Sequence, residues 1–182
     1  MADSLWSIRQ AVSGDGAFIA DMLVEAVNWS SEWRKQSRRR VLSTHKTAHY
    51  ISGWPRDTDL GVIAESDGQR IGAAWLRFHP ASDPGYGFVA ADVPELTIGV
   101  IQPWRGRGVG RDLLREIAGQ ALPAGIRQIS LSVERKNFAQ KLYLSEGYRI
   151  VDCSDKDSDT MVKDLVSRSG SAEAKHPHEP TG

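Results

Sequence analysis

The sequence has little cysteine and no long hydrophobic run. Cys153 is its only cysteine, which excludes a disulfide bond within the chain and is typical of a reducing compartment. No apolar stretch approaches the roughly 18 residues that a membrane-spanning helix needs. The first residues, MADS, lack the basic and then apolar order of a signal peptide. We therefore expect a cytoplasmic protein without a membrane partner.

The sequence also lacks an excess of charge of either sign. Its 23 Lys and Arg residues balance 23 Asp and Glu residues, so there is no general attraction to nucleic acid. One basic stretch, 34–40 (RKQSRRR), contains no acid. It is either a solvated helix face or a site for an acidic substrate or for nucleic-acid phosphates. We expect the solvated face, and no nucleic-acid partner.

What remains is the composition of an ordinary globular protein. A chain of 182 residues with 40% hydrophobic residues is sufficient for one domain with a sizeable core, and we expect it at 4–166. The segment 167–182 has no apolar periodicity and is predicted to be a disordered tail. His176 and His178 lie in that tail without further ligands nearby, so no metal is expected.

The spacing of the apolar residues predicts an α/β protein of the α+β type, with helices and several short strands. Helices are expected over 15–27, 31–45 and 137–146, and along the apolar face of 113–122. Pro123 and Gly125 should end the helix along 113–122, and Asp67-Gly68 should close a hairpin. Strands are expected at 5–12, 60–65, 71–78, 96–100, 129–133, 148–151 and 160–166.

A glycine-rich turn stands between the strand 96–100 and the helix that follows. It reads RGRGVG from Arg105 to Gly110. Glycines let the unpaired N–H groups of a helix start approach a bulky anion, most plausibly phosphate. Arg111 stands where a dinucleotide fingerprint needs glycine, and no Gly-Lys-Ser/Thr of a P-loop occurs. The alternative is a turn that merely requires positive φ angles.

A second motif, NFAQKLYLSEGY, runs from Asn137 to Tyr148. Asn137 offers an amide at the expected start of a helix, and Tyr143 has a hydroxyl that needs a partner when it is buried. Taken alone, Asn137 could simply cap the helix and Tyr143 could belong to the core.

Together, the two motifs resemble those of the GNAT superfamily of N-acetyltransferases. Its phosphate signature, Gln/Arg-x-x-Gly-x-Gly/Ala, is matched by Arg105-x-x-Gly108-x-Gly110. Its later signature of Asn, Ala, Leu-Tyr and Gly-Phe is matched by Asn137, Ala139, Leu142-Tyr143 and Gly147-Tyr148. The resemblance implies the acyl-CoA N-acyltransferase fold, a mixed and mostly antiparallel sheet of six to seven strands flanked by helices. Its fourth and fifth strands splay apart and admit coenzyme A.

The resemblance also implies a cosubstrate, acetyl-CoA, and no metal. The acetyl group would pass directly to a primary amine of a small molecule or peptide, and a homodimer is the expected assembly. Tyr143 would direct its hydroxyl at the thioester sulfur, and Asn137 would touch the pantetheine or adenosine. The backbone of three strand residues would pair with the pantetheine: Ile98, Gly99 and Val100. The pyrophosphate would lie on the N–H groups of the turn: Arg105, Gly106, Arg107, Gly108, Val109, Gly110 and Arg111.

Such a transfer needs a base, because an amine with a pKa near 10 is mostly protonated at neutral pH. Glu95 is the first candidate and Glu134 the second, although either could simply face solvent. The N–H of Val100 would stabilise the oxyanion, and Tyr143 would protonate the departing thiolate. Cys153 lies away from the motifs and is not expected to be a nucleophile.

The acceptor amine is not identified by the sequence. The region that holds the acceptor in this family is rich in aromatic residues here, and Trp29, Trp33 and Tyr86 are the candidates to wall an amine. The alternative is that these aromatics, with Tyr50 and Trp54, belong to the core or to an interface. A second function also stays open, that of a non-catalytic acyl-CoA-binding sensor with the same fold.

Overall fold

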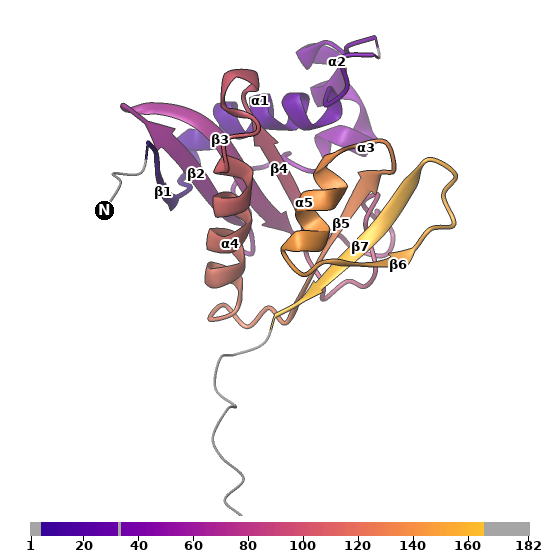
Figure 1. Ribbon diagram of the computed structural model, residues 1–182. Helices are drawn as coiled ribbons and strands as arrows, with labels where there is room; N and C mark the ends of the chain where they lie inside the picture. Colours follow the sequence, from indigo (N-terminus) through magenta and orange to yellow (C-terminus); the bar gives the residue numbers. More distant parts are fainter. Residues whose placement is uncertain (1–4, 33, 166–182) are drawn as a thin grey trace, which may run out of the picture.

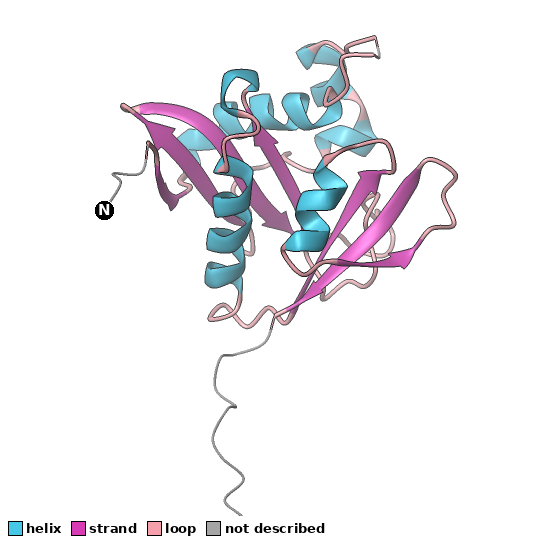
Figure 2. Cartoon of the chain, viewed as in Figure 1, coloured by secondary structure: helices cyan, strands magenta, loops and turns pink. Residues whose placement is uncertain are grey.

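A computed structural model describes residues 5–32 and 34–165, and shows a seven-stranded sheet with helices on both faces (Figures 1 and 2). The strand order is β1-β2-β3-β4-β5-β7-β6. All neighbours pair antiparallel except β4 and β5, which are parallel. The predicted fold class is therefore confirmed. The expected tail with His176 and His178, the end of the domain at Val166, and Trp33 lie outside the described residues.

The strands agree with the alternating apolar pattern to within a few residues at their ends. The Asp67-Gly68 turn joins β2 to β3, with φ angles of +48° and +74°. The strands are β1 (Ser7–Gln10), β2 (Leu60–Ser66), β3 (Gln69–Arg77), β4 (Glu95–Val100), β5 (Gln128–Glu134), β6 (Arg149–Asp152) and β7 (Ser158–Asp164).

Three of the helices agree with their predicted positions: α1 (Gly16–Val27), α4 (Val109–Ala121) and α5 (Ala139–Ser145). None of the helices in the described ranges has the length and hydrophobicity needed to span a bilayer.

The expected helix over 31–45 is wrong in extent, because two short helices stand in this region: α2 (Arg38–Ser43) and α3 (His45–Ala48). The Asn28 side chain exchanges two hydrogen bonds with the Gln36 backbone, of 2.8 and 2.9 Å, and so ties this segment to the end of α1. Ser37 then caps α2 by accepting from the Arg40 amide at 3.2 Å. Thr44 has extended angles and separates α2 from α3.

The helices form two layers around the sheet, each with its own core. The first core lies between the sheet and α4, and includes Leu113, Leu114 and Ile117. The second packs α1, α2 and the segment after α3 against the opposite face around Trp75. In Figure 1, α4 and α5 stand side by side on one face, and Glu146 links them through ion pairs with two arginines of α4, Arg111 and Arg115.

The sheet opens between β4 and β5. β4 pairs with β3 along its whole length, whereas Glu95 with Ser130 is the one pair that the described residues provide between β4 and β5. The Ser130 amide donates to the Pro94 carbonyl at 3.0 Å, and the pairing ends there. The rest of β4 therefore has an edge in the middle of the sheet without a neighbouring strand.

A buried arginine fixes the segment after α3 to the sheet. Arg77 of β3 is 1% exposed and pairs with Asp59 at 2.6 Å. Its guanidinium also donates to the carbonyls of His49 and Ser52, at 2.8 and 2.9 Å. Because a buried charge needs several partners, these bonds hold the backbone beside Tyr50 in one place.

Candidate active site

A cavity of about 790 Å³ occupies the opening between β4 and β5. It brings together most of the residues that the sequence singled out, although they come from β4, α4, β5, α5 and the loops between elements. Arg107 and Val109 do not line it, and the Val109 side chain is buried in the core instead. The predicted site residues that line it are Trp29, Tyr86, Glu95, Ile98, Gly99, Val100, Arg105, Gly106, Gly108, Gly110, Arg111, Glu134, Asn137 and Tyr143.

The backbone of β4 turns polar groups toward this cavity. The Ile101 amide donates to the Ile71 carbonyl of β3 at 3.0 Å. Because N–H and C=O directions alternate along an antiparallel strand, Gly99 also faces β3, whereas Ile98 and Val100 face the opening. The arrangement suits an extended molecule that pairs with the strand edge.

Gly99 has a packing role as well. A Cβ at this position would lie 2.4 Å from the Met22 carbonyl oxygen of α1. Glycine therefore lets α1 close directly over the strand.

The glycine turn needs its glycines for conformation, as the alternative interpretation of the sequence proposed. Gly106 and Gly108 have φ angles of +72° and +102°, which are costly for residues with a side chain. Helix α4 begins immediately afterwards at Val109, so its first amides have no partner within the helix. The same conformation thus exposes a cluster of N–H groups at the positive end of a helix dipole.

The arginine side chains of the turn are largely engaged by the protein. Arg105 pairs with Glu25 and donates through Nε to the Val100 carbonyl at 2.9 Å. Arg111 pairs with Glu146 at 3.1 Å, and Arg107 lies over the Trp104 ring. The backbone amides, more than these side chains, are therefore the groups of the turn that remain for an anion.

Glu95 does not face solvent, because it is 3% exposed at the start of β4. Oε1 accepts from the Tyr50 hydroxyl at 2.7 Å and from the Gly87 amide at 2.8 Å. Burial raises the pKa of Glu95 to about 7, against the opposing effect of these hydrogen bonds. At neutral pH the carboxyl is thus divided between its two protonation states, which suits an acid–base role.

Two glycines of the loop 78–94 make this burial feasible. A Cβ on Gly85 would lie 2.0 Å from Glu95 Oε2, and a Cβ on Gly87 would lie 2.4 Å from the Leu131 carbonyl carbon. Side chains at these positions would push the loop away from the carboxyl. The loop therefore closes over Glu95 only because these residues are glycine.

Glu134, the second candidate base, is half-buried at the end of β5. Burial raises its pKa above the ordinary value, and a hydrogen bond with the Trp29 side chain opposes that shift. Asp155 and Asp157 add to the rise through charge repulsion, and both line the cavity. Glu134 is thus more accessible than Glu95.

Tyr143 lies on α5 and is 8% exposed, at the wall of the cavity. Burial raises its pKa to about 12, so the hydroxyl stays protonated at neutral pH. In the part of the chain that the structure describes, this hydroxyl makes no hydrogen bond with the protein. Asn137 lines the cavity too, and its Oδ1 accepts from the Ala139 amide at 2.9 Å at the start of α5.

The aromatic candidates for the acceptor site divide into two groups. Trp29 and Tyr86 line the cavity, and Tyr86 is 60% exposed. Tyr50 and Trp54 belong to the core on the α1 side, as the alternative interpretation expected, although Tyr50 also lines the cavity. Sequence reasoning missed the contact of Tyr50 with Glu95, since nothing in the sequence separates this tyrosine from other core aromatics.

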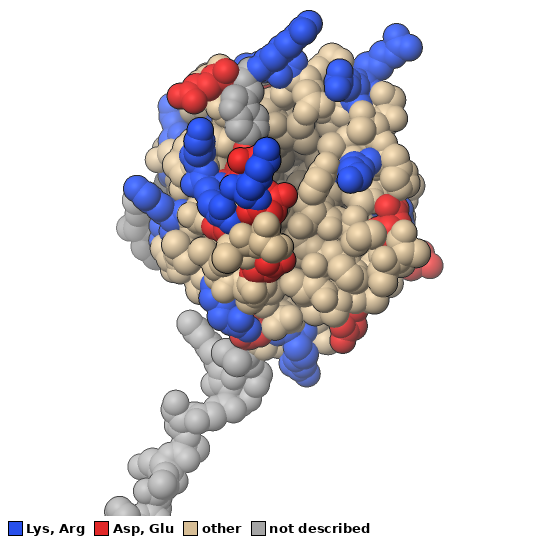
Figure 3. All heavy atoms as spheres, turned by 90° about the vertical axis from the view of Figure 1, so that its right-hand side faces the viewer, with Lys and Arg blue, Asp and Glu red and all other residues tan. Residues whose placement is uncertain are grey.

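The basic stretch 34–40 is exposed beside the cavity, and its short helix presents arginines to solvent. Arg38 pairs with Asp21 at 2.6 Å, and Arg34, Lys35 and Arg40 line a separate small pocket. Figure 3 shows a face on which several Lys and Arg side chains stand out in the upper half. Cys153 is exposed and does not line the cavity.

Comparison with known proteins places this geometry among acetyltransferases. No curated protein sequence matches the chain. The GNAT domain of S. lividans PAT aligns with a TM-score of 0.65 and 22% identity, over 87% of this chain and 89% of that one. A PaiA N-acetyltransferase of Thermoplasma acidophilum, in complex with coenzyme A, aligns with a TM-score of 0.59 and 21% identity over 87% and 98%. A ribosomal-protein-alanine N-acetyltransferase of Brucella melitensis aligns with a TM-score of 0.64 and 23% identity, over 87% of this chain and 99% of that one.

At these identities the likeness of the structures shows the shared fold. The sequence itself matches the profile of the Acetyltransferase (GNAT) family over residues 23–148, which is more than half of the chain. The resemblance predicted from the two motifs is thereby confirmed, and the chain belongs to the GNAT acetyltransferase family.

Proposed function

We propose that this protein transfers an acetyl group from acetyl-CoA directly to a primary amine of a small molecule or peptide. The observation that carries the proposal is the cavity between β4 and β5, where an unpaired strand edge, a helix start, Tyr143 and the buried Glu95 meet. A binding site for an acyl carrier and the groups for proton transfer thus share one space.

The residues present suit acetyl-CoA in shape and in charge. The outward-facing groups of Ile98 and Val100 would pair with the amides of pantetheine as a strand does. The amides from Gly106 to Arg111 would hold the pyrophosphate, because positive φ angles at Gly106 and Gly108 expose them. The Arg105 amide donates to the Gln102 carbonyl at 3.2 Å instead. Asn137 would contact the carrier near α5. When bound, acetyl-CoA supplies an activated acetyl group with a thiolate as its leaving group.

The protein's own residues would then move protons and stabilise charge. Glu95 would accept the proton of the incoming ammonium, directly or through water, because its pKa of about 7 lets it be a base at neutral pH. The N–H of Val100 would donate to the carbonyl oxygen as that oxygen gains charge. The Tyr143 hydroxyl would donate its proton to the leaving sulfur. Glu134 is kept as the alternative base.

The acceptor side of the cavity favours a cation. Trp29 and Tyr86 form walls, while Glu134, Asp155 and Asp157 supply negative charge. A protonated amine suits this lining better than a nucleic acid does. A peptide N-terminus and a small amine both qualify, and the similar ribosomal-protein-alanine N-acetyltransferase makes the peptide worth testing first. A cytoplasmic location and a homodimer remain proposals.

Replacing Gly108 by Ala should weaken binding of acetyl-CoA. A φ angle of +102° costs alanine about 1–2 kcal/mol, so the turn would rearrange and its amides would turn away from the phosphates. Affinity is measured by thermal shift against acetyl-CoA concentration.

The matched control is Gly125→Ala, which has a similar φ angle of +87° with open space around it, at the far end of α4. It should lose comparable stability and keep its affinity. If the two variants bound acetyl-CoA with equal affinity, the glycine turn would not be its binding site.

Replacing Tyr143 by Phe should lower kcat about 100-fold or more, the usual contribution of a general acid, with little change in the KM for acetyl-CoA. The measurement is steady-state kinetics with the best acceptor from a panel of amines, amino acids and peptides. Tyr148→Phe is the control, because Tyr148 is also buried but does not line the cavity. If Tyr143→Phe turned over as fast as Tyr148→Phe, Tyr143 would have no part in the reaction.

The kcat/KM for the amine should rise with pH and level off above about 7, because only the deprotonated Glu95 accepts a proton. Below about pH 7, kcat/KM should fall about tenfold for each pH unit. Glu95→Gln should abolish this dependence and lower the rate about 100-fold at pH 8.

Glu134→Gln is the paired variant. It should keep the pH dependence, and loss of the dependence in this variant alone would make Glu134 the base. Full activity of both variants would remove the need for a carboxylate base. Binding of acetyl-CoA without turnover of any acceptor would favour the sensor function.

A further inference from the structure

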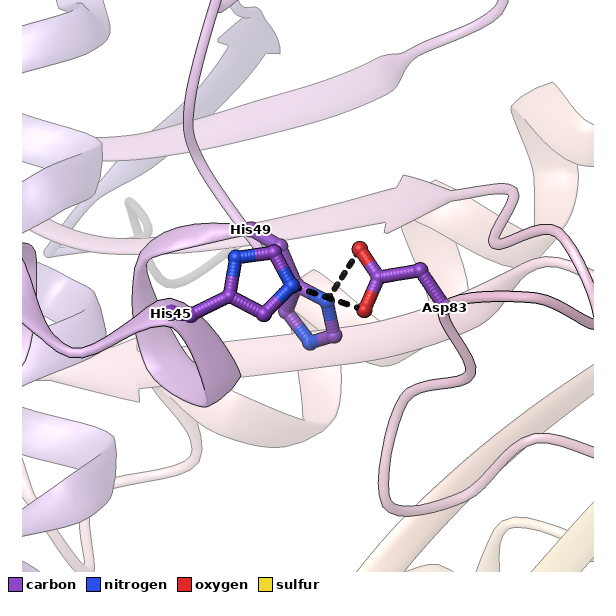
Figure 4. A group of neighbouring side chains, drawn as sticks. All are labelled: His45, His49 and Asp83. Carbon is purple, nitrogen blue, oxygen red and sulfur yellow. Dashed lines mark hydrogen bonds and ion pairs between the residues drawn. The ribbon is translucent and has the colours of Figure 1, made fainter.

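Two histidines and an aspartate meet beside the loop that covers Glu95 (Figure 4). His45 opens α3 and His49 follows one turn later, so both rings lie on one side of the helix. Asp83 comes from the loop 78–94 and points between them. His45 Nε2 lies 3.0 Å from Asp83 Oδ1, and His49 Nδ1 lies 3.2 Å from Oδ2. One ligand atom from each residue falls within 4.8 Å of the others.

Within the described part of the chain, the protein leaves one member of this cluster, the ring of His49, without hydrogen bonds. His49 is 6% exposed, and neither of its ring nitrogens has a hydrogen-bond partner of good geometry among the described residues. Its contact with Asp83 is close but lacks the alignment of a hydrogen bond. Buried polar atoms without partners are rare, and each calls for an explanation such as an ion.

The chemistry of the cluster suits a transition-metal ion. Two imidazoles and one carboxylate are ligands that Zn²⁺ prefers, and histidines at positions i and i+4 of a helix are a known way to present two of them. Ligand atoms around a tetrahedral Zn²⁺ lie about 3.4 Å apart. The two contacts of the histidines with Asp83, at 3.0 and 3.2 Å, are close to this spacing. The His45 side chain is 75% exposed, so its ring has room to adjust and an ion has a path from solvent.

We propose that His45, His49 and Asp83 bind a divalent transition-metal ion of the Zn²⁺ type, with a fourth position open to water. No metal was expected from the sequence, because only His176 and His178 were considered as ligands. The ligands of the proposed site come from α3 and from a loop that is distant in the chain, and the fold brings them together.

The ion would clamp together the two segments that enclose Glu95. His49 is followed by Tyr50, whose hydroxyl donates to Glu95. Asp83 precedes Tyr86 and Gly87, whose amides donate to the Tyr50 hydroxyl at 2.7 Å and to Glu95 at 2.8 Å. A metal bridge from α3 to the loop would thus hold both sides of this hydrogen-bonded network, without taking part in the reaction itself.

The test uses the untagged full chain with His176→Asn and His178→Asn, so that tail histidines cannot bind the ion. After treatment with a chelator, Zn²⁺ is titrated by calorimetry, and Co²⁺ is titrated by visible absorption. We expect one Zn²⁺ per chain, a raised Tm, and no competition from Mg²⁺, which prefers oxygen ligands. If this background binds no Zn²⁺, the site does not exist.

Two ligand variants and one control locate the ion. His45→Asn and Asp83→Asn should each weaken Zn²⁺ binding more than about tenfold, the scale on which metal sites respond even to changes around their ligands. Lys46→Gln, an exposed neighbour on α3, should bind as the background does. Unchanged affinity in both ligand variants would overturn the assignment.

Hydrogen exchange then tests the clamp, independently of any acetyl transfer. Zn²⁺ should slow exchange of the Tyr86 and Gly87 amides in the background, and should not slow it in His45→Asn. Zn²⁺ binding without slower exchange at these two amides would refute the clamp.

Discussion

The structure depends on an interrupted strand pairing. In the residues that the structure describes, β4 and β5 pair at Glu95 and Ser130 alone, so the backbone of Ile98 and Val100 faces an opening in the centre of the sheet. Buried N–H and C=O groups must find partners, and in a continuous sheet the next strand would supply them. We propose that an extended ligand takes the place of that strand here. The cavity lies in this gap, and the start of α4 and Tyr143 of α5 line it.

The same opening creates the electrostatics of the site. One end has the amides at the start of α4 and the positive end of the helix dipole, where we propose that the acyl carrier binds. The other end, the proposed acceptor side, has carboxyl groups and aromatic walls. Between them, Glu95 sits where the paired part of β4 gives way to the gap, sealed by a loop whose glycines permit close contact. Burial raises the pKa of the Glu95 carboxyl, and the hydrogen bond from the Tyr50 hydroxyl keeps this carboxyl oriented. Burial thus gives this carboxyl the pKa that its proposed role as a base requires.

The sequence predicted the parts of this arrangement that are encoded locally. Alternating apolar residues indicated the strands, and the glycine turn followed by a helix indicated the carrier side, because both signals lie within about ten consecutive residues. The helix expected over 31–45 was wrong because a contact from Asn28 and the cap at Ser37 determine where the helix begins. The environment of Glu95 was beyond prediction for a similar reason, since its partner Tyr50 is 45 positions away. The cluster of His45 and Asp83 spans 38 positions and gave no local signal either.

The most direct measurement is a crystal structure of the chain with coenzyme A. The account predicts pantetheine paired with Ile98 and Val100, the pyrophosphate on the amides that follow Gly106, and the sulfur within hydrogen-bond distance of the Tyr143 hydroxyl. Coenzyme A bound outside the opening between β4 and β5, or strands that close against each other in the complex, would contradict it.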